Sequence, residues 1–263
     1  MNPQLICIVA RQRSGTTALQ GILAQTGRVE SFGEIFHTDR LDRPGSFFGF
    51  CRDNKVLLSD VAAAPELEKL CRRYFEHLGT IAGPKHRLID VKYNSWDAVR
   101  PAWRYPQEEP FFLSFLKRMD TLFIFVRRLD IAEQIISGHI ARANDQWQNL
   151  ALTSSDQAQI EIDIGKVRRE ARFICQAESF LWRHLKNYKR LLHFTYETLY
   201  EDSNLALEAR ARISEALGDN LTFPDVPPIR KNEVDKAASV KNYQAVVAAV
   251  EKVVATYKRP MTA

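Results

Sequence analysis

The chain divides into short, unbroken apolar runs and longer stretches in which apolar residues recur every three or four positions. The short runs have the length of strands and are rich in β-branched residues, which is typical of strands buried on both faces of a parallel sheet. They cover residues 5–10, 86–92, 122–126 and 191–196. Helical spacing is found in the segments 18–23, 54–80, 132–143, 166–190, 206–217 and 241–257.

Strands that alternate with helices predict an α/β fold, a three-layer sandwich with a central parallel sheet flanked by helices. With 263 residues and 45% hydrophobic content, the chain can bury one substantial core, and we expect residues 1–263 to form a single domain. In the helix expected over 166–190, one polar residue, Glu178, belongs to an otherwise apolar stripe. Packing against the core explains this stripe, and the seam of a homodimer is the alternative.

The turn after the first apolar run is polar, contains two arginines and leads into the first helical segment. A strand, a Gly/Ser/Thr turn and a helix form a cradle for anions, because free N–H groups converge there and the helix dipole adds positive charge. The turn departs from the nucleotide triphosphate loop G-x-x-x-x-G-K-[ST], since a threonine occupies the lysine position. An ordinary corner with solvated arginines is the alternative. The candidate anion ligands are Arg11, Arg13, Ser14, Gly15, Thr16 and Thr17.

A second strand–turn–helix unit begins with residues 122–126. The strand is expected to lead into Arg127 and Arg128, and Asp130 can cap the helix that follows. Ser137 lies two turns along that helix, so an arginine at the strand end and this serine can converge on one phosphate. Arg128 is the preferred phosphate ligand, and Arg127 is the alternative.

A single carboxylate, Glu34, follows the first helical segment among the apolar residues Phe32, Ile35 and Phe36. Partial desolvation in such surroundings would make the carboxylate a better proton acceptor, so Glu34 is the candidate general base. An exposed loop position is the alternative reading. The neighbouring His37 could share the role or cap a loop.

The formal net charge of +5 is a mild excess, and the arginines do not form a run. A small polyanionic ligand explains this charge better than a nucleic acid. Four cysteines without C-x-x-C spacing predict reduced thiols and neither disulfides nor a metal site. No targeting segment and no apolar span of roughly 18 residues is visible, so we expect a cytoplasmic protein without stable membrane insertion.

Two motifs resemble those of a known enzyme family. Residues 13–17 resemble the 5′-phosphosulfate loop of sulfotransferases, [KR]-S-G-T-[TS]. The pattern R-x-D-x-x-x-Q-x-x-S resembles the 3′-phosphate segment of bacterial carbohydrate sulfotransferases of the trehalose 2-sulfotransferase type, although Leu129 stands where that family has a second arginine. Residues 196–199, Y-E-T-L, resemble the segment after the last core strand of many sulfotransferases. The R-x-D-x-x-x-Q-x-x-S pattern consists of Arg128, Asp130, Gln134 and Ser137.

The resemblance implies a P-loop-like fold and transfer of a sulfuryl group from 3′-phosphoadenosine-5′-phosphosulfate (PAPS) to a hydroxyl, with 3′-phosphoadenosine-5′-phosphate (PAP) as product and no required metal. The acceptor would be a carbohydrate or glycolipid, and no nucleic-acid partner is expected. Arg13 would stabilise the leaving 5′-phosphate and Glu34 would take the proton of the acceptor. A basic C-terminal loop would close over the nucleotide with Arg230 and Lys231. The acceptor side would contain His37, Lys92 and Trp147.

Two other functions share the strand–loop–helix unit. A P-loop kinase or nucleotide hydrolase would need a lysine at position 16 and a Mg²⁺ ion. Asp90 could stand at a metal-holding strand end, but Lys92 would compete with the Mg²⁺ for the same carboxylate. A non-catalytic module that binds the nucleotide without turnover is the second alternative.

Overall fold

The computed structural model describes residues 2–102, 108–143, 159–202, 204–225 and 235–257. Five parallel strands form the central sheet in the order β2-β3-β1-β4-β5, which confirms the predicted α/β class with a parallel sheet. The strands are β1 (Leu5–Ala10), β2 (Val29–Glu34), β3 (His86–Lys92), β4 (Leu122–Arg127) and β5 (Leu191–Thr195). A short antiparallel pair, β6 (Tyr200–Glu201) and β7 (Asn204–Leu205), lies outside this sheet.

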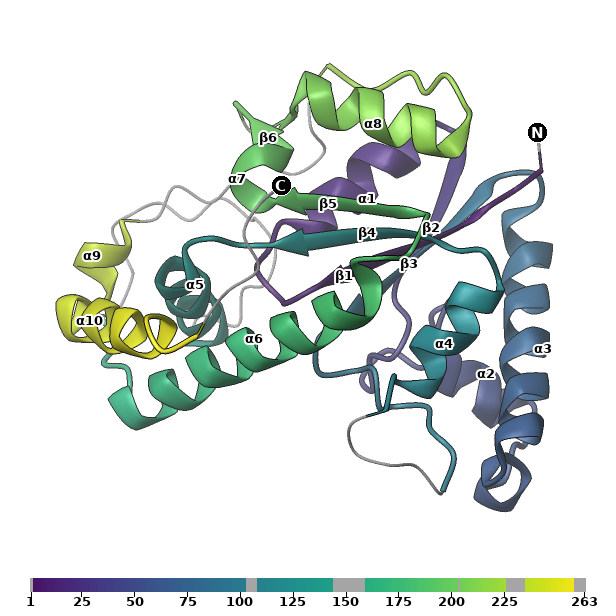
Figure 1. Ribbon diagram of the computed structural model, residues 1–263, viewed down its shortest axis with the longest axis horizontal. Coiled ribbons are helices and arrows are strands. Elements are labelled where there is room, and N and C mark those ends of the chain that lie inside the picture. Colours follow the sequence, from purple (N-terminus) through teal and green to yellow (C-terminus); the bar gives the residue numbers. More distant parts are fainter. Residues whose placement is uncertain (1, 103–107, 144–158, 203, 226–234, 258–263) are drawn as a thin grey trace.

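Helices cover both faces of the sheet (Figure 1). One face packs against α1 (Thr16–Gln25) and α8 (Leu207–Leu217). The other face packs against α3 (Ala64–Ala82), α4 (Phe111–Arg118) and α6 (Ile164–Leu185). A third apolar cluster joins the outer half of α6 to α5 (Ile131–Ala143) and α10 (Tyr243–Val254), at the left of Figure 1. The short elements are α2 (Phe47–Asp53), a 3-10 turn at Leu58–Val61, α7 (Tyr196–Leu199) and α9 (Lys236–Ser239).

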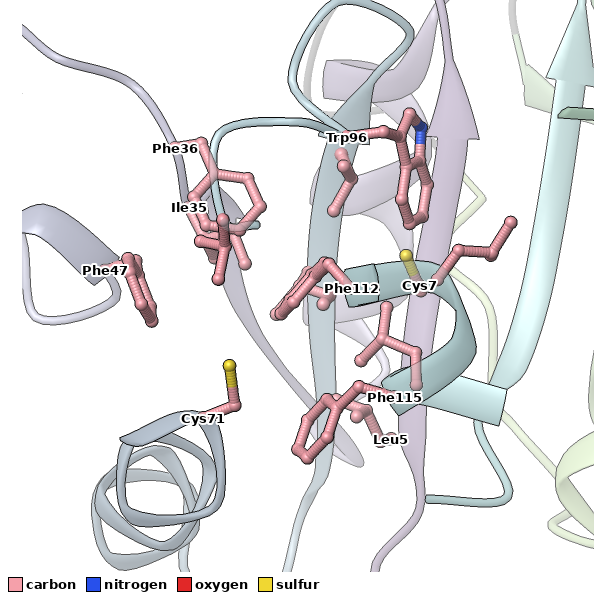
Figure 2. Packing of buried hydrophobic residues seen from close by; sticks show 14 of the residues in the cluster. Leu5, Cys7, Ile35, Phe36, Phe47, Cys71, Trp96, Phe112 and Phe115 are labelled. Carbon is pink, nitrogen blue, oxygen red and sulfur yellow. The ribbon is translucent and has the colours of Figure 1, made fainter. Parts of the chain in front are cut away.

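Strand β1 lies in the middle of the sheet, and all six of its residues are buried. Because side chains alternate along a strand, Leu5 and Cys7 pack with α3 and α4 (Figure 2), whereas Ile6 and Ile8 pack with α1 and α8. Both faces of β1 are therefore apolar, which explains the unbroken apolar run that begins the sequence.

Three segments differ from the sequence-based expectation. Three prolines and several aromatic residues in 100–112 predict a loop, but this segment includes the start of α4, since Pro110 precedes the helix and Phe112 is fully buried. Polar residues with glycine and proline in 39–50 predict a surface excursion, but this segment includes the first residues of α2, capped by Ser46. Helical spacing extends over 54–80, and Pro65 predicts a helix start nearby; α3 begins at Ala64, with Pro65 in its first turn.

The apolar stripe of α6 belongs to the core of the chain, since Val167, Ala171, Ile174, Leu181 and Leu185 are buried within it. The seam of a dimer is therefore not needed to explain them. None of the four cysteines, all of which lie in the described ranges, forms a disulfide bond, and Cys7, Cys71 and Cys175 are buried. In the described ranges, every helix is too short or too polar to cross a membrane.

The strand order places a topological switch point at β1. The chain leaves β1 toward β2 and β3 on one side, and β4 and β5 lie on the other side. In open parallel sheets, ligands bind outside the carboxyl ends of the strands at such a point. The turns that follow β1 and β4 therefore lie side by side where a ligand is expected.

Candidate functional site

The turn between β1 and α1 has an unusual backbone that presents several N–H groups together. Arg13 has a φ of 65° and Gly15 a φ of 76°, both in the left-handed region. No side chain caps α1 at Gly15. Within the described ranges, no backbone carbonyl accepts a hydrogen bond from the backbone N–H groups of residues 14–17. Unsatisfied donors at a helix start are a binding site for an anion.

Gln134 on α5 holds this turn in place through two hydrogen bonds. Its side-chain amide donates to the carbonyl of Gln12 at 2.9 Å and to the hydroxyl of Ser14 at 2.8 Å. Both Gln134 and Ser14 are buried. The Ser14 hydroxyl accepts the bond from Gln134, so both its hydroxyl proton and its backbone N–H can donate to an anion.

The two arginines after β4 point to different places. Arg127 is buried and lies 3.6 Å from the equally buried carboxylate of Glu178 on α6. Arg128 lies at the turn after β1, where it donates to the carbonyl of Arg13 at 3.2 Å, and its guanidinium stacks 4.7 Å from the ring centre of Tyr196. Arg128 is thus the arginine beside the anion cradle.

Arg13 and Ser137 connect the two strand–turn–helix units. The Nε atom of Arg13 donates to Ser137 Oγ at 3.0 Å, which leaves the hydroxyl proton of Ser137 to donate elsewhere. The pKa of Arg13 is lowered, first by burial and then by the positive charge of Arg128, while Tyr196 opposes this effect. Two guanidinium groups held close together by the fold would be stabilised by a bound anion.

Two tyrosines that follow β5, Tyr196 and Tyr200, pack against Gly15 in the turn after β1. The hydroxyl of Tyr200 donates to the carbonyl of Gly15 at 2.7 Å. A Cβ atom on Gly15 would lie 2.7 Å from the ring of Tyr200 and 2.9 Å from that of Tyr196. Glycine is therefore needed at position 15 for its positive φ and for the closeness of these rings.

We expect Gly15→Ala to weaken nucleotide binding and to lower the free energy of unfolding by about 1–3 kcal/mol, because of left-handed strain and the tyrosine rings. Thermal unfolding and calorimetric titration measure the two effects. Gly27→Ala is the matched control, since Gly27 has a φ of 72° but nothing within 4 Å of the new Cβ. Equal losses of nucleotide affinity in both variants would contradict the role of the tyrosine rings.

Lys92, at the end of β3, lies under the start of α1. Its ammonium donates to Thr16 Oγ1 at 2.6 Å and to Asp90 Oδ2 at 2.6 Å. Asp90 also accepts from the side-chain amide of Gln20 at 2.7 Å. Lys92, which was expected on the acceptor side, contacts the turn after β1 through Thr16.

Glu34 lies at the carboxyl end of β2, next to β3. A bulge between Ser31 and Gly33 shifts the register of β2, so that Glu34 pairs with Asp90. The Glu34 carboxylate lies 3.6 Å from the Lys92 ammonium, and its side chain is 37% exposed. Phe32, Ile35 and Phe36 pack into the core. These neighbours therefore face the core, while the partly buried Glu34 carboxylate faces a cation.

The remaining predicted residues lie around this centre. The backbone N–H of His37 donates to the Glu34 carbonyl at 3.3 Å, and its Nδ1 accepts from the backbone of Asp39 at 3.2 Å. Arg11 stacks on Phe173 of α6, and its charged neighbours include Glu170, Arg142 and Glu34. Arg11 thus lies toward the Glu34 side of the loop. Thr17 is exposed on the first turn of α1. Trp147, Arg230 and Lys231 lie outside the described residues.

Sequence reasoning assigned no role to Gln20 or Tyr200. It considered Asp90 only as a metal-holding residue of the kinase-type alternative, and Tyr196 only as part of the Y-E-T-L motif. Alternation along β3 was the available signal for Asp90, since residues two apart share a face and Lys92 follows it by two. In the part of the chain that the structure describes, no group of three or more His, Cys, Asp or Glu side chains is placed to hold a metal ion.

The chain is similar to known proteins in structure and not in sequence. No family model and no curated protein matches the chain. The chain is similar to a solved structure, the sulfotransferase domain from the Synechococcus PCC 7002 olefin synthase, with a TM-score of 0.48 and 16% sequence identity. The match covers 98% of this chain and 97% of that chain. At this identity and TM-score the similarity does not by itself assign a function.

Proposed function

We propose that this protein is a sulfotransferase that moves a sulfuryl group from PAPS to a hydroxyl acceptor, a carbohydrate or glycolipid. One observation carries the proposal. The two segments that resemble a 5′-phosphosulfate loop and a 3′-phosphate segment are joined directly, through Arg13 Nε and Ser137 Oγ at 3.0 Å and through Arg128 and the Arg13 carbonyl at 3.2 Å. A donor with phosphates at both ends of one ribose requires two such sites side by side.

The residues present fit a nucleotide with phosphate groups at two positions. Unsatisfied N–H groups at the start of α1 and the Arg13 guanidinium suit a 5′-phosphate group, while Arg128 and the Ser137 hydroxyl suit a 3′-phosphate. The pKa of Arg13 is lowered, first by burial and then by Arg128, so a bound phosphate would stabilise its charged form.

The donor would supply an activated sulfuryl group on its 5′-phosphate. The chain would then act by positioning and by charge. Glu34 would accept the proton of the acceptor hydroxyl while the oxygen of that hydroxyl forms a bond to sulfur. Arg13 and the loop N–H groups would stabilise the 5′-phosphate as the bond from sulfur to the phosphate oxygen breaks. The Lys92 ammonium lies between these two ends, since it contacts Thr16 and is 3.6 Å from Glu34.

A kinase or nucleotide hydrolase is less compatible with the loop. In those enzymes the loop lysine reaches the β- and γ-phosphates, and the Ser/Thr that follows it binds Mg²⁺. Here the lysine position is occupied by Thr16, whose hydroxyl accepts from the Lys92 ammonium at 2.6 Å, and the position that follows is Thr17. The loop therefore lacks the lysine that such enzymes use on the transferred phosphate.

We therefore expect sulfuryl transfer to be independent of divalent metal. Purified protein incubated with PAPS and a panel of hydroxylated acceptors should form a sulfated product, detected by mass spectrometry, and excess EDTA should leave the rate unchanged. The matched assay replaces PAPS with ATP and Mg²⁺, for which we expect neither phosphoryl transfer nor hydrolysis. Loss of activity with EDTA and its recovery with Mg²⁺ would favour the kinase-type function.

A further inference from the structure

Asp90 is a carboxylate buried inside the fold, beside the proposed active site. The residue is 1% exposed and lies on β3 under α1. Its pKa is raised by burial, with Lys92 opposing the rise and Glu34 adding to it. An ionised carboxylate in such a place requires strong partners, because burial of an unpaired charge costs several kcal/mol or more.

The partners of Asp90 come from two elements and share one of its oxygens. Oδ2 accepts from Lys92 Nζ at 2.6 Å and from Gln20 Nε2 at 2.7 Å. Gln20 is itself held by β2, since its Oε1 accepts from the Ser31 hydroxyl at 3.3 Å. These hydrogen bonds link α1, β2 and β3 around the carboxylate. Asp90 is therefore fixed in position by its surroundings.

The geometry of Lys92 depends on this fixed carboxylate. An ammonium has three N–H donors. Asp90 and Thr16 each accept one at 2.6 Å, whereas Glu34 Oε1 is 3.6 Å away. The ammonium is thus shared between two carboxylates and is drawn closer to Asp90 than to Glu34.

We infer that Asp90 is a positioning residue, whose carboxylate holds the Lys92 ammonium against Thr16 and keeps it from closing on Glu34. The inference rests on the proposed function, in which Glu34 is the proton acceptor. Without the charge of Asp90, the Lys92 ammonium would pair with Glu34 alone. The negative charge of Asp90, which repels the carboxylate of Glu34, would also be removed. Both changes stabilise the charged form of Glu34 and make it a weaker base.

Asp90→Asn tests this inference because it keeps the shape of the side chain and removes its charge. The charged groups that face Glu34 are Lys92 and Asp90 from β3 and Arg11 from the turn after β1. We expect the acid limb of the pH–turnover profile to move about one pH unit lower and the plateau to fall severalfold. Nucleotide affinity should change much less.

Glu178→Gln is the matched control, since Glu178 is also 1% exposed and paired with a cation, but lies with Arg127 and α6. It should lower the unfolding temperature without moving the acid limb. A purely structural role of Asp90 predicts the same behaviour for Asp90→Asn. An unmoved acid limb in Asp90→Asn would therefore overturn the inference.

A second measurement does not depend on activity. In protein with isotope-labelled lysines, the ammonium protons of Lys92 should be protected from exchange with water. Their NMR signal is assigned by its loss in Lys92→Met. Asp90→Asn should remove this protection, and Glu178→Gln should keep it. Unchanged protection in Asp90→Asn would overturn the inference. If that variant does not fold, Gln20→Met removes the other donor to the carboxylate and should raise the exchange rate, and an unchanged rate would also overturn it.

The two measurements separate the inference from the function on which it rests. A wild-type protein without sulfuryl transfer to any acceptor would contradict the proposed function. Loss of ammonium protection in Asp90→Asn would, in the same protein, still confirm that Asp90 positions Lys92.

Discussion

Replacement of Glu34 by glutamine is expected to lower turnover by roughly 10²–10⁴-fold, the usual contribution of a general base. Glutamine keeps the size and the hydrogen-bonding capacity of the side chain but cannot accept the proton. Glu34 lies at the end of β2, 3.6 Å from Lys92, while the anion cradle is formed by the segments after β1 and β4. Nucleotide affinity, measured by calorimetry, should therefore change little. Turnover is measured from the initial rate of product formation.

Two further variants define what the Glu34→Gln result means. Arg13→Ala should reduce both turnover and nucleotide affinity, because Arg13 belongs to the anion cradle. His37→Ala should leave turnover close to that of the wild type, since His37 uses Nδ1 to accept from Asp39 in a turn. Near-normal turnover in Glu34→Gln together with a large loss in His37→Ala would identify His37 as the base. Normal nucleotide binding without turnover in the wild-type protein would favour the non-catalytic module.

The second large effect concerns the 3′-phosphate of the nucleotide. PAP should bind more tightly than adenosine 5′-monophosphate by about 2–3 kcal/mol, since a charge-assisted contact with Arg128 and a contact with the Ser137 hydroxyl are lost without the 3′-phosphate. This difference corresponds to a ratio of dissociation constants of roughly 30–150 at 25 °C. Calorimetric titration of both nucleotides at one ionic strength measures the ratio. Equal affinities would contradict the role of both residues.

Variants at the two arginines locate the origin of this preference. Arg128→Gln should remove most of the preference for PAP, and Ser137→Ala should reduce it. The control is the double variant Arg127→Gln/Glu178→Gln, which neutralises both partners of the buried pair and avoids leaving one charge alone. It should keep the preference. Loss of the preference in the double variant and not in Arg128→Gln would assign the 3′-phosphate to Arg127.

Strands β1, β3 and β4 were predictable because burial on both faces produces apolar runs, as in residues 5–10. Strand β5, at one edge of the sheet, was also predicted from its apolar residues. Strand β2 was not recognised as part of the sheet, since its sequence, VESFGE, combines an edge position with a bulge and has only two buried residues. The order of the strands and the pairing of Glu34 with Asp90 depend on contacts between distant segments, which periodicity does not encode.

At the site, strand–turn–helix patterns identified the loop of residues 13–17 and the unit that carries Arg128 and Ser137, and the structure places Arg128 and Ser137 beside Arg13. Their role in binding phosphate stays a prediction. The preference for Arg128 over Arg127 agrees with its position beside Arg13. The surroundings of Glu34 were not predictable from its sequence neighbours. Lys92 is 58 positions away along the sequence and approaches Glu34 because β2 and β3 are adjacent in the sheet.

The hydrogen bonds that hold the turn after β1 join distant parts of the chain, which affects when the proposed binding site forms during folding. The bond from Tyr200 to Gly15 joins residues 185 positions apart, and the bond from Arg13 to Ser137 joins residues 124 positions apart. Contacts of such long sequence separation form late, because the entropy of closing the intervening chain must first be overcome. Partly folded chains, including those still emerging from the ribosome, would therefore bind the nucleotide poorly. Ligand present during refolding should stabilise only the completed fold and shift the folding equilibrium toward it.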